Sequence, residues 1–273
     1  MLRKSAVVGM VVTALVLPAA AQETERTMPV RNFDRFELES ETVNGLWAEA
    51  GAFLQRKTVQ GSAKRDIDVT TAFARLAYGG SNKWEGDLSI PYHLVDKDQI
   101  SGGKTLNVGD YDGIGDIQLS GKYVPVRDPL FDFGVGALVS LPSGDDAKAL
   151  GSGEFGGMPF ITGSLHLAVA EVRGHFGAEF FTGSNQNGQA TDSFVYGVSI
   201  NAPLGKYLAL RNEFAGTTLR DLPGTPKAVS YLPGLDIRIP IGSWDVLLRP
   251  TAIIGMTDLA PDWGVGGSIV VTQ

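Results

Sequence analysis

The sequence lacks cysteine, and after its first 21 residues it also lacks any long apolar run. Without cysteine, the chain forms neither disulfides nor thiolate metal sites. A helical membrane protein is excluded, because no later apolar stretch reaches the roughly 18 residues that a spanning helix needs. Positive charge is scarce as well: 23 Lys and Arg oppose 30 Asp and Glu, which argues against nucleic acid as a partner. A membrane location would therefore require a closed β-barrel, since an open sheet edge leaves amides unsatisfied in hydrocarbon.

The N-terminus has the layout of a secretory signal peptide. Two basic residues, Arg3 and Lys4, precede an apolar run that ends at Leu17, and small alanines follow. The run is too short for a spanning helix with these flanks. We therefore predict a signal peptide over residues 1–21 and export of the mature chain. The polar residues 22–42 are predicted to form a periplasmic N-terminal segment or a partial plug.

Residues 43–273 alternate apolar with polar or small side chains in segments of roughly 10 to 14 residues, separated by turn residues. We count twelve such segments, at 44–57, 68–78, 83–94, 113–124, 130–141, 157–169, 172–183, 191–202, 207–217, 228–239, 244–255 and 263–272. Every second connection is short, and the longest ones are expected at 58–67, 95–112 and 142–156. This rhythm predicts an all-β, closed, antiparallel up-and-down transmembrane barrel of about 12 strands in the bacterial outer membrane, with both ends on the periplasmic side.

Period-two alternation separates two faces on each segment. In 83–94, for example, Trp84 and Ile90 share one face while Glu85 and Asp87 share the other. Asn212 is the one polar residue on the apolar face of its segment. A soluble barrel would turn the apolar face inward, but the signal peptide, the loop rhythm and aromatic residues near segment ends favour apolar side chains facing lipid. These aromatic residues are Trp84, Tyr123, Phe131, Trp244 and Trp263.

On this interpretation, charges of both signs line the lumen. The candidate lumen residues are Glu85, Asp87, His93, Asp116, Lys122, His166, Arg173, His175, Glu179, Arg211, Glu213, Asp236, Arg238, Asp245 and Arg249, with Glu49, Arg75 and Lys83 as further inward charges. These charges either fill and stiffen the lumen or form a polar constriction that selects solutes. A tight turn at 240–243 would place Arg238 opposite Asp245.

The histidines raise one catalytic alternative. A tight turn near Glu171 would place His166 opposite His175, with Ser164 two residues away on the same face. A Ser and a His on a barrel wall could act as nucleophile and base in a lipid hydrolase. Catalysis on lipid, however, requires the pair on the outer surface, so we predict no catalytic residues. The acidic loop residues match no calcium-loop spacing, and we predict neither metal nor cofactor.

Two motifs carry a resemblance to a known family. The run 112–123 resembles a "GxGDxxLxxKY" strand, and 141–145 followed by 150–153 resembles an "LPTGD…LGTG" hairpin loop. Together they are similar to the outer-membrane β-barrel family named after the meta-pathway of phenol degradation. The resemblance implies a transporter-like barrel in Gram-negative outer-membrane lipid that moves small, often aromatic or apolar, solutes. Such barrels usually finish on an aromatic residue, whereas this chain ends in Gln273. A structural or adhesive surface barrel is the remaining alternative.

Overall fold

The computed structural model describes residues 42, 44–60, 64–81, 83–101, 104–148, 150–183, 192–219 and 227–272. The predicted signal peptide and all but the last residue of the predicted N-terminal segment lie outside these ranges. Within the described ranges no helix is long and apolar enough to cross a membrane.

The described chain forms one antiparallel sheet of fourteen strands. The elements are β1 (Gly45–Gln60), β2 (Lys64–Gly80), β3 (Trp84–Ser101), β4 (Lys104–Ile114), β5 (Ile117–Arg127), β6 (Phe131–Leu141), the short 3₁₀ helix η3 (Asp146–Lys148), β7 (Gly156–His166), β8 (Glu171–Phe181), β9 (Ser193–Pro203), β10 (Leu208–Leu219), β11 (Lys227–Ile241), β12 (Trp244–Leu248), β13 (Thr251–Gly255) and β14 (Trp263–Thr272).

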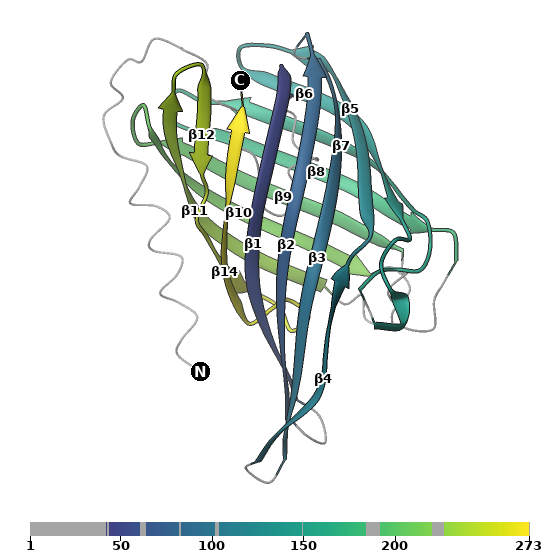
Figure 1. Ribbon diagram of the computed structural model, residues 1–273. Helices are drawn as coiled ribbons and strands as arrows, with labels where there is room; N and C mark the ends of the chain where they lie inside the picture. The colour runs from purple at the N-terminus through teal and green to yellow at the C-terminus, as the bar shows by residue number, and fades with distance from the viewer. Residues whose placement is uncertain are drawn as a thin grey trace.

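The sheet closes on itself because β1 pairs with both β2 and β14 (Figure 1). The fourteen strands occupy twelve positions around the wall. β4 and β5 both pair with β3, and β12 and β13 both lie between β11 and β14. The interruption before β13 coincides with Pro250, which has no N–H to donate to the ladder. The predicted closed antiparallel barrel of twelve strands is therefore confirmed.

The longest connections lie at one end of the barrel, and most of the short ones lie at the other (Figure 1). Five connections of two to four residues, at 81–83, 128–130, 167–170, 204–207 and 242–243, share one end, which we call the turn end. β1 begins and β14 ends there, since Trp47 pairs with Thr272. The opposite end, which we call the loop end, carries the connection between β6 and β7. The predicted alternation of short and longer connections is therefore present from β5 onward, whereas the loop-end connections between β1 and β2 and between β3 and β4 are as short as the turns.

Two predicted loops are wrong, because much of 58–67 and 95–112 is strand. β1 continues to Gln60, which pairs with Lys64, and β3 continues to Ser101, which pairs with Lys104. Together β1 to β4 project beyond the rest of the wall at the loop end (Figure 1), and we call this part the hairpin extension. Its strands carry polar residues on both faces, so apolar alternation stops while the backbone ladder continues.

The alternation has the sense expected for a membrane barrel. Trp84 and Tyr123 face outward with 45% and 49% of their surfaces exposed, whereas Glu85 and Lys122, which follow or precede them, are 2% and 4% exposed. The misfit Asn212 is accommodated on the outer face, because the Tyr231 hydroxyl donates a hydrogen bond to its side-chain oxygen at 2.6 Å. All five predicted aromatic residues near strand ends are exposed. The outer wall is therefore suited to contact with hydrocarbon.

Candidate functional site: the polar lumen

The predicted lumen residues point inward from many strands. Nine are buried, and six are half-buried near the ends or beside a cavity. The buried residues are Glu85, Asp87, Lys122, Arg173, His175, Arg211, Glu213, Asp236 and Arg249, and the half-buried ones are His93, Asp116, His166, Glu179, Arg238 and Asp245. Lys83 is a correction: it lies exposed in the turn before β3, where strand alternation no longer applies. Burial makes the partners of the charged groups decisive, because an unpaired buried charge is costly.

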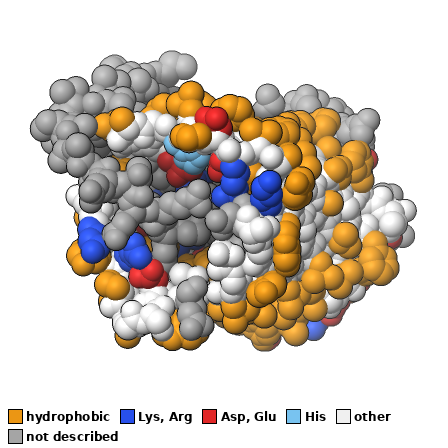
Figure 2. All heavy atoms as spheres, turned by 90° about the horizontal axis from the view of Figure 1, so that it is seen from above, with side chains coloured by type: hydrophobic (Ala, Val, Ile, Leu, Met, Phe, Trp, Pro, Cys, Tyr) orange, Lys and Arg blue, Asp and Glu red, His pale blue; other side chains and the backbone are white. Residues whose placement is uncertain are grey.

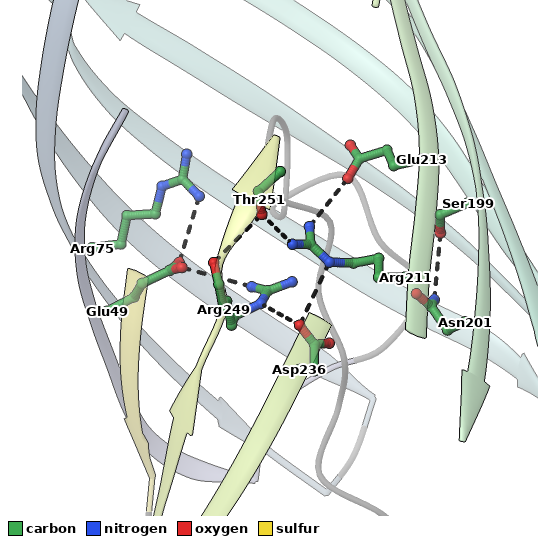
Figure 3. A network of polar contacts seen from close by, with 9 residues as sticks. All are labelled: Glu49, Arg75, Ser199, Asn201, Arg211, Glu213, Asp236, Arg249 and Thr251. Atoms are coloured by element: carbon green, nitrogen blue, oxygen red, sulfur yellow. Dashed lines mark hydrogen bonds and ion pairs between the residues drawn. The ribbon is translucent and has the colours of Figure 1, made fainter. Parts of the chain in front are cut away.

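Part of the wall carries a chain of alternating charges, shown in Figure 3. We call it the charge belt, and in order along the chain of contacts it comprises Arg75, Glu49, Arg249, Asp236, Arg211 and Glu213. Glu49 lies 3.5 Å from the Arg75 guanidinium and 3.6 Å from that of Arg249. Asp236 then bridges Arg249 at 3.4 Å and Arg211 at 3.5 Å. The belt therefore links β2, β1, β11 and β10. Arg249, which lies between β12 and β13, connects Glu49 of β1 to Asp236 of β11.

The charge belt is formally neutral. Its three arginines face three carboxylates, and their side chains are at most 10% exposed. The Arg211 guanidinium also donates to the Thr251 hydroxyl at 2.6 Å. Removing one member of a buried ion pair leaves its partner uncompensated, which costs about 3–5 kcal/mol. The belt is thus both a brace across the wall and a fixed pattern of charge inside the barrel.

A second ion pair lies on β3 and β5. Lys122 and Glu85 are direct partners in the strand register, and the ammonium lies 3.3 Å from the carboxylate with both side chains fully buried. On the next inward row, the Ser120 hydroxyl donates to Asp87. Buried polar residues therefore line this part of the wall too.

The predicted histidine pair is wrong. His166 is the register partner of Glu171, while His175 pairs with Thr162. The turn occupies 167–170, whereas the sequence predicted a tight turn near Glu171, so the register of β7 and β8 differs from the predicted one. His166 places Nδ1 3.4 Å from Glu171 and Nε2 3.5 Å from Asp132. Since both ring nitrogens face carboxylates, the geometry does not resemble a Ser–His pair ready for nucleophilic attack.

The mouth at the turn end gathers polar side chains inside a ring of apolar ones. Figure 2 shows acidic, basic and histidine side chains in the mouth, while hydrophobic side chains cover the visible outer wall. Glu171 there contacts Arg173 at 2.5 Å, and Arg127 donates to the Thr42 hydroxyl at 2.8 Å. A solute entering at this end would meet hydrogen-bonding groups and charges of both signs.

The expected pairing of Arg238 with Asp245 is confirmed as an ion pair but not as a register match. The guanidinium donates two hydrogen bonds to the carboxylate at 2.6 and 2.9 Å. The register partners, however, are Arg238 with Leu247 and Asp245 with Pro240. Arg238 and Asp245 are thus diagonal neighbours on β11 and β12, and the long arginine side chain reaches across to the carboxylate.

A cavity of about 470 Å³ opens between the wall and the connection from β6 to β7. Apolar rings from Phe53, Phe73 and Phe181 line it beside polar groups such as Arg75. The predicted residues His93, Asp116 and Glu179 also contribute to its lining. Phe53 borders a second cavity of about 180 Å³. The interior therefore offers space with mixed apolar and polar walls next to the charge belt.

Sequence reasoning missed the apolar clusters inside the barrel. Phe73, Leu232 and Ile253 form a buried cluster with Ala215, and Phe53 packs against it. These residues occupy inward positions of their strands, so the alternation of side chains could have revealed them. The prediction, however, considered only the charged residues on the inner face.

No family model and no curated protein matches this chain. Among solved structures, it is similar to the COG4313 outer membrane channel from Pseudomonas putida F1, with a TM-score of 0.60 and 13% identity over 89% of this chain and 100% of that one. The NanC porin gives a TM-score of 0.52 and 10% identity over 84% and 98% of the two chains. The KdgM porin gives 0.52 and 8% over 83% and 99%. At these identities the likeness concerns the fold, and the fold of this chain is that of a bacterial outer-membrane β-barrel.

Proposed function

We propose that the chain is a passive channel that lets small solutes cross the bacterial outer membrane through its lumen. The observation that carries this proposal is the closed barrel whose outer wall is apolar while its interior holds paired charges beside a cavity of about 470 Å³. An apolar exterior suits lipid, and a polar interior supplies hydrogen bonds to a solute that has lost part of its hydration. On the general rule for such barrels, the turn end faces the periplasm.

The similar solved structures support a channel, since their names describe an outer membrane channel and two porins. The motif resemblance to the phenol meta-pathway family adds a solute class, namely small aromatic or apolar compounds. The phenylalanines in the cavity lining are consistent with such solutes, because aromatic rings stack with and bury apolar groups. Export by the predicted signal peptide is part of the same proposal.

Reconstitution of the purified full chain tests the proposal. We expect discrete conductance steps in planar bilayers and uptake of small solutes by liposomes that contain the protein. An aromatic solute and a sugar of similar size, compared in the same liposomes, test the solute class. Absence of both conductance and flux from correctly assembled protein would refute the channel function, and equal flux of the two solutes would refute the preference.

The lipid-hydrolase alternative has a separate test. Ser164 is 3% exposed and points into the barrel, away from surrounding lipid. We therefore expect no lipid turnover by the wild-type protein. Turnover that disappears in Ser164→Ala or His166→Ala variants would instead establish an enzyme.

A further inference from the structure

Asp116, between β4 and β5, binds the backbone of the connection from β6 to β7. One carboxylate oxygen accepts a hydrogen bond from the Gly144 N–H at 3.0 Å, and the other accepts one from the Ser152 N–H at 2.6 Å. The two donors come from opposite ends of the connection, so a single side chain fastens both ends. We call residues 142–148 and 150–155 the inserted loop. Hydrogen bonds to a charged acceptor are about twice as strong as neutral ones.

Close backbone packing surrounds this attachment. A Cβ atom built on Gly151 would lie 2.3 Å from the Asp116 carboxylate oxygen, and one built on Gly144 would lie 2.7 Å from the Gly151 Cα. Both positions therefore require glycine for the loop to reach Asp116. Ser143 adds a second link, since its hydroxyl donates to the Gly115 carbonyl at 3.0 Å and accepts from the Ile117 N–H at 2.8 Å.

The inserted loop forms one side of the large cavity. Leu150, Gly151 and Ser152 line it together with side chains of the wall such as Arg75 and Phe73. Leu150 and Ser152 are 5% and 7% exposed, so this part of the loop is packed inside the barrel. The position of the loop consequently determines how much space the cavity has at the loop end.

We propose that Asp116 is a positioning residue that holds the inserted loop inside the barrel and thereby sets the size of solute that the loop end admits. This inference rests on the proposed channel function. It also gives a physical role to the two motifs noted in the sequence, because the aspartate of the first motif binds backbone amides of the second. Those motifs thus describe one attachment between a strand and a loop.

Two variants release the loop in different ways. Asp116→Ala removes both acceptor oxygens, whereas Gly151→Ala keeps the carboxylate but places a methyl group against it. Asp258→Ala is the matched charge control, because Asp258 is exposed in another connection at the loop end. Gly157→Ala is the matched glycine control, since a Cβ there meets no heavy atom within 4 Å.

Trypsin reports the loop position independently of transport. Lys148 is the only Lys or Arg in residues 142–155. We expect cleavage at Lys148 to be about tenfold faster in folded Asp116→Ala and Gly151→Ala barrels, which corresponds to about 1.4 kcal/mol of lost attachment. In the same two variants we expect larger single-channel conductance and liposome uptake of larger sugars than in wild-type protein, with both controls at the wild-type level.

Assembly is checked by the heat-dependent mobility of the folded barrel in detergent gels, and Gly151→Ala carries the test if Asp116→Ala does not assemble. If the assembled variants are cleaved at the wild-type rate, the proposed attachment of the inserted loop by Asp116 is refuted. Faster cleavage with an unchanged conductance and size limit would overturn the link to solute size. If wild-type protein conducts nothing, the channel function and the size limit both fail, while the trypsin assay still decides whether Asp116 holds the loop.

Discussion

Replacing Glu49 by Gln removes one carboxylate from the charge belt while preserving the shape of the side chain. Glu49 is 3% exposed, and two arginine guanidinium groups lie 3.5 and 3.6 Å from it. At an effective dielectric constant of about 20, each contact supplies about 5 kcal/mol of attraction. Desolvation of the carboxylate offsets several kcal/mol of this sum, so we expect the variant to lose about 3–5 kcal/mol of unfolding free energy.

The same variant changes the belt charge from neutral to +1, so we also expect the proposed channel to prefer anions. Urea unfolding in lipid vesicles measures the first effect, and the reversal potential across a salt gradient measures the second. Adding Arg249→Met restores neutrality, so it should recover part of the lost stability and reduce the preference for anions. As a control, Asp68→Asn breaks an ion pair in the hairpin extension whose side chains are 44% and 30% exposed, and should cost less than about 1 kcal/mol.

Two results would contradict this reasoning. Wild-type stability in Glu49→Gln would mean that the belt does not brace the wall. A double variant whose stability loss equals the sum of its two single losses would mean that Glu49 and Arg249 do not interact energetically.

Three further predictions concern other parts of the barrel. Leu119→Lys, which places a charge against lipid, should reduce the unfolding free energy by about 2–4 kcal/mol at mid-bilayer depth, whereas inward Gln118→Lys should not. In the hairpin extension, a hydrogen bond to Asp110 raises the pKa of Asp96. The pair therefore stabilises the folded state at acidic pH and loses that contribution as the pH rises through the raised pKa. Asp110→Asn should return the pKa of Asp96 toward its ordinary value, as measured by a carboxyl NMR titration. Gly136→Val, whose Cβ would lie 2.3 Å from a facing phenylalanine ring, should cost about 1–3 kcal/mol in urea unfolding.

The wall could be predicted from the sequence because its two environments differ sharply. Lipid on one side and a polar lumen on the other impose an alternation of side chains that strands such as β3 and β5 display clearly. Where both faces are polar, as in the hairpin extension, that contrast disappears and strand was mistaken for loop. The sequence therefore predicts the membrane-facing part of the fold better than its projecting part.

The candidate site was predicted less completely, because its details depend on register and on contacts distant in sequence. The turn at 167–170 contains no glycine, proline, asparagine or aspartate, so nothing in its local sequence fixed the partner of His166. The inward direction of Asp116 followed from alternation. Its attachment to Gly144 and Ser152 did not, because the backbone position of a loop depends on the whole fold.

The pairing of β1 with β14 has a consequence for how the protein is made. This seam joins ten residue pairs, from Trp47 with Thr272 to Arg56 with Trp263, so its two halves leave the ribosome at opposite ends of synthesis. Until the last strand arrives, β1 has an open edge that would pair with any other exposed strand. The exported chain must therefore be kept apart from its neighbours until the barrel closes, and a chain truncated before β14 should aggregate instead of inserting.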